Sequence, residues 1–268
     1  MATYDRQFYL EQQAGSLASA KQIVPLLLDI VRPQSVIDVG CGIGAWLSVC
    51  IEAGIEDIIG VDGDYVDRRM LLFPPSKFIP ADLRRPIGID RRFDLVMSLE
   101  VVEHLPNECE RVFIDSLVKL GPAVLFAGSA PVRGGIGHVN EQWQSHWVRS
   151  FGERNYAMVD CIRPVVWDNP EVAWWYAQDA LLFVEENWLL QNPGVGKRRC
   201  RDTTMVDVIH PRLFEEVIDP NRMSIRKALG AIASIPGRVF RKANRGVDGE
   251  RRPRIHGNSR ASQREGTK

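Results

Sequence analysis

The segment VIDVGCGIGAWL, residues 36–47, constrains the fold of this chain more than any other stretch. It starts as an apolar strand that carries an acid, Asp38, and continues with glycines at alternate positions, Gly40, Gly42 and Gly44. A helical pattern follows. A strand, a glycine-rich turn and a helix in this order bring backbone N–H groups and a helix N-terminus close to a ligand. The segment therefore predicts a ligand-binding loop.

Strands and helices alternate along the first half of the chain. The expected order is helix 17–31, strand 35–39, helix 45–54, strands 57–62, 77–82 and 93–99, helix 109–121 and strand 123–129. A glycine-rich loop, a helix and two strands joined by a long aromatic loop follow, at 131–140, 141–151, 156–162 and 180–186. This alternation predicts an α/β fold with helices on both faces of a mostly parallel sheet, finished by an antiparallel strand pair.

Length and composition favour one sizeable domain. The chain has 268 residues, of which 45% are hydrophobic, enough for a single core. No apolar run approaches the roughly 20 residues that span a bilayer, and the polar N-terminus does not read as a signal peptide. The five cysteines show no CxxC spacing, which favours a reducing compartment. We therefore expect a cytoplasmic protein.

Charge divides the chain into a domain, residues 1–220, and a basic tail, residues 221–268. The formal net charge is +0, yet the tail holds thirteen Lys or Arg and only three Asp or Glu. Residues 224–242 predict a basic amphipathic helix, and residues 243–268 have the composition of a disordered segment. The helix has three interpretations: peripheral contact with an anionic membrane, packing on the domain, or the less favoured contact with nucleic acid.

The glycine pattern distinguishes between two cofactor types. Dinucleotide-binding folds prefer GxGxxG, whereas this chain has an acid followed by GxGxG. VIDVGCGIG resembles the first motif of the class I S-adenosyl-L-methionine (SAM)-dependent methyltransferases, and the resemblance extends over about residues 16–186. It implies a Rossmann-like fold, SAM as the cofactor and methyl transfer as the activity. A dinucleotide oxidoreductase is a distant alternative.

The same resemblance implies a set of cofactor-binding residues. Asp62, at the end of the second strand, would accept the ribose hydroxyls, because a carboxylate can accept two hydrogen bonds. Asp82 would contact the adenine amino group, and Leu83 would offer its backbone N–H to the ring. The complete expected set is Asp38, Gly40, Cys41, Gly42, Gly44, Asp62, Gly63, Asp82, Leu83, Leu99 and Glu100.

The acceptor half of the site is expected to hold a general base. A hydroxyl nucleophile benefits from one, and histidine is well suited to the task. His138, in the glycine-rich loop after the fifth strand, is the first choice for the catalytic base, followed by His104 in EVVEHL and by Glu141; Glu100 and Glu103 are further alternatives. We expect no metal, because the acids that follow this loop in the sequence, such as Asp160, Asp168 and Asp179, are scattered.

The acceptor is expected to be a small molecule or a glycan. GGIGHVNEQW, the aromatic stretch 165–179 and VIHP look similar to parts of bacterial methyltransferases encoded among surface-polysaccharide genes, which implies polysaccharide biosynthesis and O-methylation of a saccharide hydroxyl. Aromatic side chains of the stretch could stack on a sugar or pack over the sheet. The alternatives are a methyltransferase for a lipid, small metabolite or RNA, and a noncatalytic SAM-binding scaffold protein.

Overall fold

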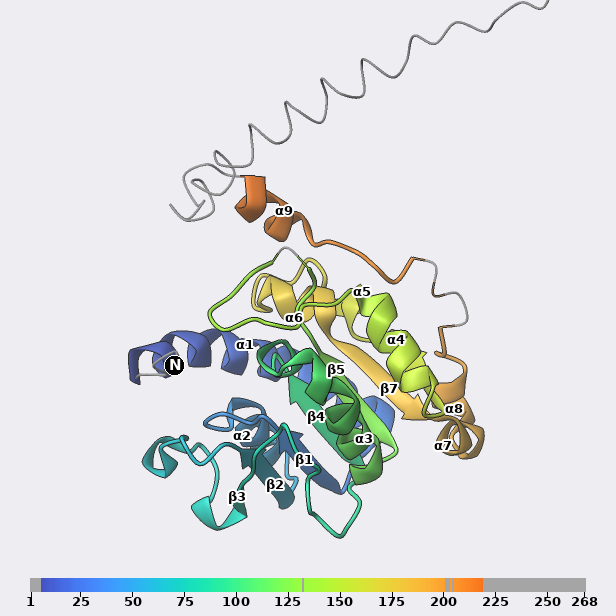
Figure 1. The fold of residues 1–268 in the computed structure, drawn as a ribbon. Coiled ribbons are helices and arrows are strands. Elements are labelled where there is room, and N and C mark those ends of the chain that lie inside the picture. The colour runs from blue at the N-terminus through green and yellow to red at the C-terminus, as the bar shows by residue number, and fades with distance from the viewer. Residues whose placement is uncertain (1–5, 132, 201–202, 204, 219–268) are drawn as a thin grey trace, which may run out of the picture. The chain divides into compact units, whose positions relative to one another are not determined.

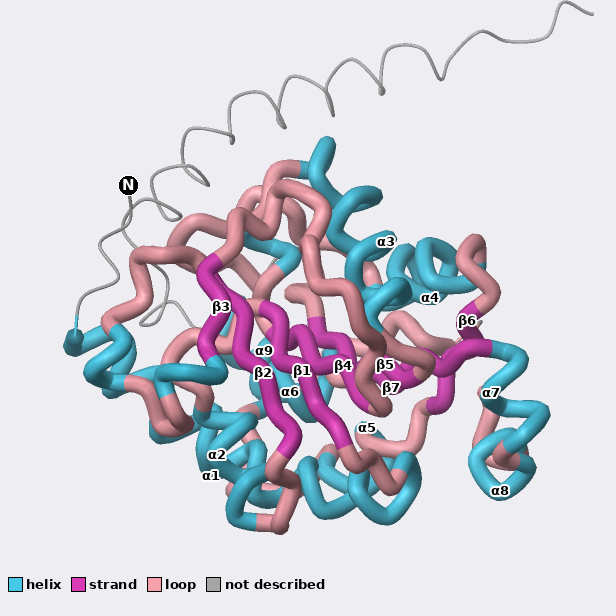
Figure 2. Tube along the Cα trace, turned by 90° about the horizontal axis from the view of Figure 1, so that it is seen from below, coloured by secondary structure: helices cyan, strands magenta, loops and turns pink. Residues whose placement is uncertain are grey.

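A seven-stranded sheet forms the centre of the protein, whose structure is a computed structural model that describes residues 6–131, 133–200, 203 and 205–218. The strands are β1 (Ser35–Val39), β2 (Asp57–Asp62), β3 (Phe78–Pro80), β4 (Leu95–Leu99), β5 (Ala123–Ala127), β6 (Tyr156–Val159) and β7 (Leu181–Glu185). Their order is β3-β2-β1-β4-β5-β7-β6 (Figure 2). Strands β1 to β5 pair in parallel, and β7 is antiparallel to both β5 and β6. The mostly parallel sheet with a terminal antiparallel pair is confirmed.

The strand order creates a switch point between β1 and β4. From β1 the chain moves outward to β2 and β3, and it then returns to the other side of β1 to place β4 and β5. Asp38 of β1 is in register with Gly60 of β2 and with Met97 of β4, so it lies in the middle of the sheet. In open α/β sheets the crevice at the carboxyl ends of the strands beside a switch point binds ligands.

Helices cover both faces of the sheet (Figures 1 and 2). They are α1 (Arg6–Val31), α2 (Ala45–Glu52), α3 (Glu110–Leu120), α4 (Gln144–Gly152), α5 (Arg163–Val166), α6 (Trp174–Asp179), α7 (Glu186–Gln191), α8 (Pro193–Gly196) and α9 (Pro211–Ile218). Short 3-10 turns are η1 (Arg68–Met70), η2 (Pro75–Lys77), η3 (Val102–His104) and η4 (Asn107–Cys109). The helices 45–54, 109–121 and 141–151 are confirmed with small shifts of their ends.

The two sides of the sheet build two separate cores. Along β5, Leu125 points into the core under α1, α2 and α6, whereas Phe126 points into the core under α3 and α4. Such alternation is what a strand with both faces covered requires. Helix α3 shows the matching pattern, because its buried Phe113, Ile114 and Leu117 recur at helical spacing.

Two expectations about local structure were wrong. Helix α1 starts at Arg6 rather than at residue 17 and contains Pro25, whose side chain is exposed. Proline removes one helical hydrogen bond, and on an exposed face water can satisfy the carbonyl that loses it. The expected aromatic loop 165–179 instead contains the ends of α5 and all of α6, because Trp174 and Tyr176 are buried and pack the helix onto the sheet. Strands β3, β5, β6 and β7 also end one to three residues earlier than expected, where the chain turns away from the sheet, and β3, β4 and β7 begin one or two residues later.

The described part of the chain belongs to one compact unit, Met1–Ile218. The expected tail 221–268, with its amphipathic helix, lies outside the described residues, so the division at residue 220 stays a prediction. Within the described segments, no helix combines the length and the apolar character that crossing a bilayer demands.

Candidate functional site

The loop after β1 is built on glycines that no other residue could replace without strain. Gly40, Gly42 and Gly44 have φ angles of 84°, 52° and 85°, in the left-handed region that disfavours side chains. A Cβ on Gly40 would lie 2.2 Å from a methyl carbon of Val101, and one on Gly44 would lie 2.2 Å from the Phe73 ring. A Cβ on Gly42 would meet nothing within 4 Å, so Gly42 faces open space.

Asp62, at the end of β2, is tied to this loop by hydrogen bonds. Its Oδ2 accepts from the backbone N–H of Gly42 at 2.7 Å. Its Oδ1 accepts from the N–H of Gly63 and from the hydroxyl of Tyr65, both at 2.6 Å. Burial raises the pKa of Asp62, while these three donors lower it. The carboxylate therefore already accepts a hydroxyl hydrogen at the mouth of the glycine loop.

Asp38 lies below the same loop, in the middle of the sheet. The residue is 2% exposed, and its Oδ2 has no hydrogen-bond partner among the described residues. Burial, with a further contribution from the charge of Asp62, raises the pKa of Asp38 to about 8. A buried acceptor without a partner costs free energy, so it is a place where a bound donor would be stabilised.

Asp82 and Leu83 follow β3 next to Asp62. The N–H of Ala81 donates to the carbonyl of Asp62 at 2.8 Å, which brings this turn to the same sheet edge. Leu83 is buried in the core, whereas the partly exposed Asp82 pairs with the Arg84 guanidinium at 2.8 Å. Hydrogen bonds from Arg84 lower the pKa of Asp82. The contact of Asp82 with adenine stays a prediction.

The turn after β4 contacts the glycine loop through Val101, which lies over Gly40. Leu99 is buried at the end of β4, and Glu100 follows it with a φ of 60°. Non-glycine residues in this region are uncommon and occur preferentially at functional sites. The N–H of Glu100 donates to the carbonyl of Ala127 at 2.9 Å, and its side chain forms a mostly buried ion pair with Arg133.

His138 and Glu141 form a pair in the loop after β5. His138 Nδ1 lies 2.9 Å from Glu141 Oε1, which also accepts from the N–H of Gly134 at 2.7 Å. The His138 side chain is 10% exposed. The rings of His104 and His138 meet edge to face with centroids 4.9 Å apart. The three expected catalytic residues His138, His104 and Glu141 therefore lie together, although they come from two different connections.

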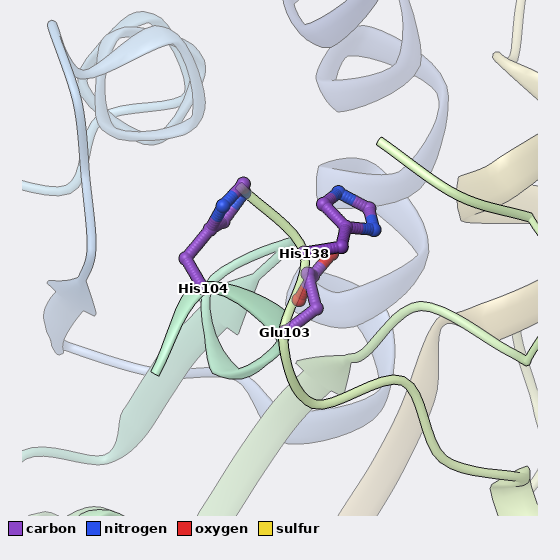
Figure 3. A group of neighbouring side chains, drawn as sticks. All are labelled: Glu103, His104 and His138. Atoms are coloured by element: carbon purple, nitrogen blue, oxygen red, sulfur yellow. The ribbon is translucent and has the colours of Figure 1, made fainter. Parts of the chain in front are cut away.

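Glu103 lies beneath the two imidazoles (Figure 3). It is 0% exposed, and neither carboxylate oxygen has a hydrogen-bond partner among the described residues. Its carbonyl accepts from the N–H groups of Val139 and Asn140 at 2.7 and 3.1 Å, which holds the loop after β5 against η3. Burial, together with the charge of Glu100, raises the pKa of Glu103. Burial and the neighbouring His138 lower the pKa of His104, which favours the neutral imidazole.

The residues of the β1–β2 edge fit SAM. The fit rests on Asp62, which accepts a hydroxyl as it would accept a ribose diol, and on the open space above Gly42. The unpartnered Oδ2 of Asp38 adds a buried acceptor for a cationic or N–H donor.

The comparison with protein families decides the assignment. Residues 9–159, more than half of the chain, match a family model described as a methyltransferase domain. The chain belongs to this methyltransferase-domain family. With the acid–GxGxG motif and the sheet order, the match makes the protein a class I SAM-dependent methyltransferase, and SAM is its cofactor.

Solved structures of methyltransferases resemble the chain at low sequence identity. The methyltransferase domain of bacterial CtHen1-C is 20% identical with a TM-score of 0.46, over 63% of this chain and 97% of that chain. Magnesium protoporphyrin IX methyltransferase (ChlM) from Synechocystis PCC 6803 with bound SAM is 16% identical with a TM-score of 0.46, over 69% and 85%. DesVI from Streptomyces venezuelae is 21% identical with a TM-score of 0.41, over 48% of this chain but only 58% of that one. No curated protein matches the chain.

Three residues of the methyltransferase site had little or no part in the sequence-based predictions. Tyr65 and Arg133 were absent from them, and Glu103 appeared only as an alternative base. A signal exists for Tyr65, which follows Asp62 by three residues and can reach back to it across the turn. The position of Arg133 depends on the path of a long loop, for which local sequence offers no rule. The aromatic residues Trp174 and Tyr176 are core residues, which favours packing over stacking on a sugar.

Proposed function

We propose that this methyltransferase transfers the methyl group of SAM to a hydroxyl of a saccharide. The observation that carries the proposal is the His138–Glu141 pair, at 2.9 Å, at the carboxyl edge of β5. This edge adjoins the turn after β4, which contacts the glycine loop through Val101 and Gly40. A base held beside the cofactor loop suits an acceptor that must lose a proton, as a hydroxyl must.

In this proposal the cofactor is held by the β1–β2 edge. Asp62 accepts the ribose hydroxyls in place of the Tyr65 hydroxyl, Gly42 leaves room for the cofactor, and Asp38 supplies a buried acceptor. Asp82 and Leu83 border the adenine end, as their position next to Asp62 allows. When bound, SAM supplies a methyl group that is already activated by its sulfonium, so the chain's own residues have to orient the acceptor and take its proton.

His138 has the better geometry for the base. Glu141 accepts a hydrogen bond from Nδ1–H, which fixes the tautomer that carries a lone pair on Nε2. Glu141 is itself held by the N–H of Gly134, so the pair is oriented before an acceptor arrives. His104, edge to face with His138, lines the same space and is kept neutral by its lowered pKa.

A saccharide is the acceptor class that best matches the polar side chains gathered here. Carboxylates and imidazoles lie together, and Arg133 lies over the rings of Trp174 and Trp175 at 5.3 and 5.2 Å. Carboxylates and guanidinium groups form hydrogen bonds with the hydroxyls of such ligands, and an aromatic ring can pack against the apolar side of a sugar. Trp175 is half-buried, whereas Trp174 and Tyr176 are buried, so Trp175 is the aromatic residue of 174–176 that could contact such a ligand.

The first test identifies the acceptor class and does not require the acceptor to be known in advance. The pure full-length protein is incubated with methyl-labelled SAM and with separated fractions of the cells that make it. Label in the glycan or lipid-linked glycan fraction supports the proposal. Label in lipid, RNA or small metabolites keeps the methyltransferase and overturns the saccharide, and SAM binding with no label in any fraction favours a noncatalytic scaffold.

His138→Gln tests the base once a labelled fraction is known. Loss of a general base costs about 10²- to 10⁴-fold in rate, whereas the SAM affinity should hold because His138 lies outside the β1–β2 edge. His146→Gln is the matched control, because His146 also pairs with a glutamate, Glu110, at 2.7 Å but sits on α4. Unchanged turnover in His138→Gln would show that the base is elsewhere.

The basic tail, residues 221–268, leads us to include an anionic membrane as a partner in the proposal. Thirteen basic residues at 221–268 would bring a cytoplasmic enzyme to an anionic membrane, where it could reach lipid-linked glycans. Sedimentation of the full chain with anionic and with neutral vesicles tests this. Binding to the anionic vesicles alone, and its loss at high salt, is expected; equal recovery with both vesicles would remove the membrane contact.

A further inference from the structure

We infer that Glu103, His104 and His138 form a binding site for one divalent first-row transition-metal ion. The three side chains offer one carboxylate oxygen and two imidazole nitrogens that all lie within 4.8 Å of one another. Figure 3 shows them next to one another, Glu103 and His104 on η3 and His138 on the loop after β5. The sequence-based expectation was a site without metal, because the acids Asp160, Asp168 and Asp179 are scattered; Glu103, His104 and His138 were not considered as one ligand set.

The buried carboxylate is the independent observation that points to a cation. Both oxygens of Glu103 are buried and have no hydrogen-bond partner among the described residues, and Oε1 of Glu100 is in the same condition. An ionised carboxylate in such a place needs a proton or a cation. Neither imidazole is hydrogen-bonded to the Glu103 carboxylate, whereas one ion would bind all three groups as a mixed nitrogen and oxygen ligand set.

The distances fit an ion once the side chains draw together. In a tetrahedral site, metal–nitrogen and metal–oxygen bonds of about 2.0–2.2 Å keep two ligand atoms about 3.3–3.6 Å apart. The observed limit of 4.8 Å therefore asks for a movement of up to about 1.5 Å, shared among the three side chains. Glu103 is fully buried, while His104 and His138 are partly exposed, so the open side of the ion would face the acceptor space. A site with three protein ligands and an open position is the arrangement of catalytic metal centres.

The surroundings of His138 match those of a ligand histidine. Metal-bound histidines almost always give their second ring nitrogen to a carboxylate or a carbonyl, which orients the ring. Glu141 does this for Nδ1 at 2.9 Å, so Nε2 is the nitrogen that an ion would bind. A Cβ on residue 135 would come within 2.3 Å of His138 Nε2. Glycine at this position therefore avoids a side chain that would clash with the nitrogen. Two imidazoles favour a transition ion such as Mn²⁺ or Co²⁺ over Mg²⁺ or Ca²⁺.

The inference deepens the proposed function and rests on it for the chemistry. A divalent ion lowers the pKa of a hydroxyl that contacts it, so the acceptor could lose its proton to solvent water when the ion is bound. His138 would then hold the ion, and it would take the acceptor's proton itself only in the protein without the ion. The metal site can be tested without SAM and without an acceptor, so its failure is distinguishable from a failure of the methyltransferase assignment.

The experiment is a titration of the chelator-treated full-length protein with Mn²⁺, followed by the electron paramagnetic resonance of the free ion. We expect one strong site per chain, and with Co²⁺ a visible absorption band from its histidine ligands. Glu141→Gln should weaken Mn²⁺ binding about 10- to 100-fold, as loss of an orienting partner does, and Glu103→Gln and His138→Gln should weaken it further. His146→Gln is the control and should bind as the wild type does.

Folding of the variants is checked by thermal unfolding in chelator. His104→Asn serves as a second ligand variant if Glu103→Gln unfolds. Mn²⁺ should raise the unfolding temperature of the wild type and of His146→Gln but not of the ligand variants, because only a folded site binds the ion. No strong site in the wild type, or equal binding by wild type and folded ligand variants, would overturn the inference.

Discussion

Gly42→Ala separates the cofactor role of the glycine loop from its structural role. Gly42 has a φ of 52°, and a Cβ there would meet nothing within 4 Å. An alanine in the left-handed region costs about 1–2 kcal/mol, of which about 0.4–1 kcal/mol is returned because alanine is less free than glycine in the unfolded chain. The variant should therefore lose about 1 kcal/mol of stability. Its backbone N–H still donates to Asp62.

SAM binding should respond much more strongly than stability. If the space above Gly42 belongs to the cofactor, the added methyl overpacks it, at a cost of about 1–3 kcal/mol. That corresponds to about 5- to 150-fold in the dissociation constant, measured by isothermal titration calorimetry. Gly54→Ala is the matched control, because Gly54 has a φ of 92° and also faces open space. It should show a similar loss of stability with no loss of affinity; equal affinities in both variants would refute the placement of the cofactor at Gly42.

Other predictions follow from single contacts. Asp62→Asn removes the charged acceptor and should weaken SAM about 10- to 150-fold, or about 1.5–3 kcal/mol, whereas Tyr65→Phe should leave the affinity nearly unchanged in calorimetry. Gly44→Ala should be destabilised by about 2–5 kcal/mol in urea unfolding, since it combines left-handed strain with a clash on Phe73, and Phe73→Leu should restore part of the loss. The folded Asp38 holds its proton up to about pH 8, whereas the unfolded chain loses it near 3.8, so this residue should lower stability as pH rises between these values. Asp38→Asn should remove that part of the slope, up to about 1.4 kcal/mol per pH unit, and an unchanged slope would contradict the raised pKa.

Local sequence patterns predicted most of the secondary structure and the fold class. The strands at 35–39 and 57–62 have the bounds predicted, because each is an apolar run bounded by a turn. The parallel pairing of β1 to β5 follows from the alternation of strands and helices, whereas the strand order and the switch point were not predicted. The expectations fell short where tertiary contacts override local signals. Residues 174–179 are helical because Trp174 and Tyr176 find a core, and Pro25 is accommodated because its side of α1 faces water.

The candidate site was predictable in its parts but not in its assembly. Asp62 and His138 were named from their positions after strands, and the structure places them at the carboxyl edge of the sheet. The partnership of His138 with Glu141 lies within one loop and could be read from spacing. The convergence of Glu103 with His138 depends on how the loop after β5 folds back, through hydrogen bonds from Val139 and Asn140 to the Glu103 carbonyl. No periodic pattern encodes such a contact.

The most direct test of the account is the position of the transferred methyl group in the product. The labelled material from the extract experiment is hydrolysed to its components and examined by mass spectrometry and linkage analysis. The account predicts a methyl ether on a sugar carbon, formed by the wild type, retained with His146→Gln and reduced at least 100-fold with His138→Gln. A methyl group on nitrogen, on a lipid or on a nucleotide would contradict the proposed acceptor.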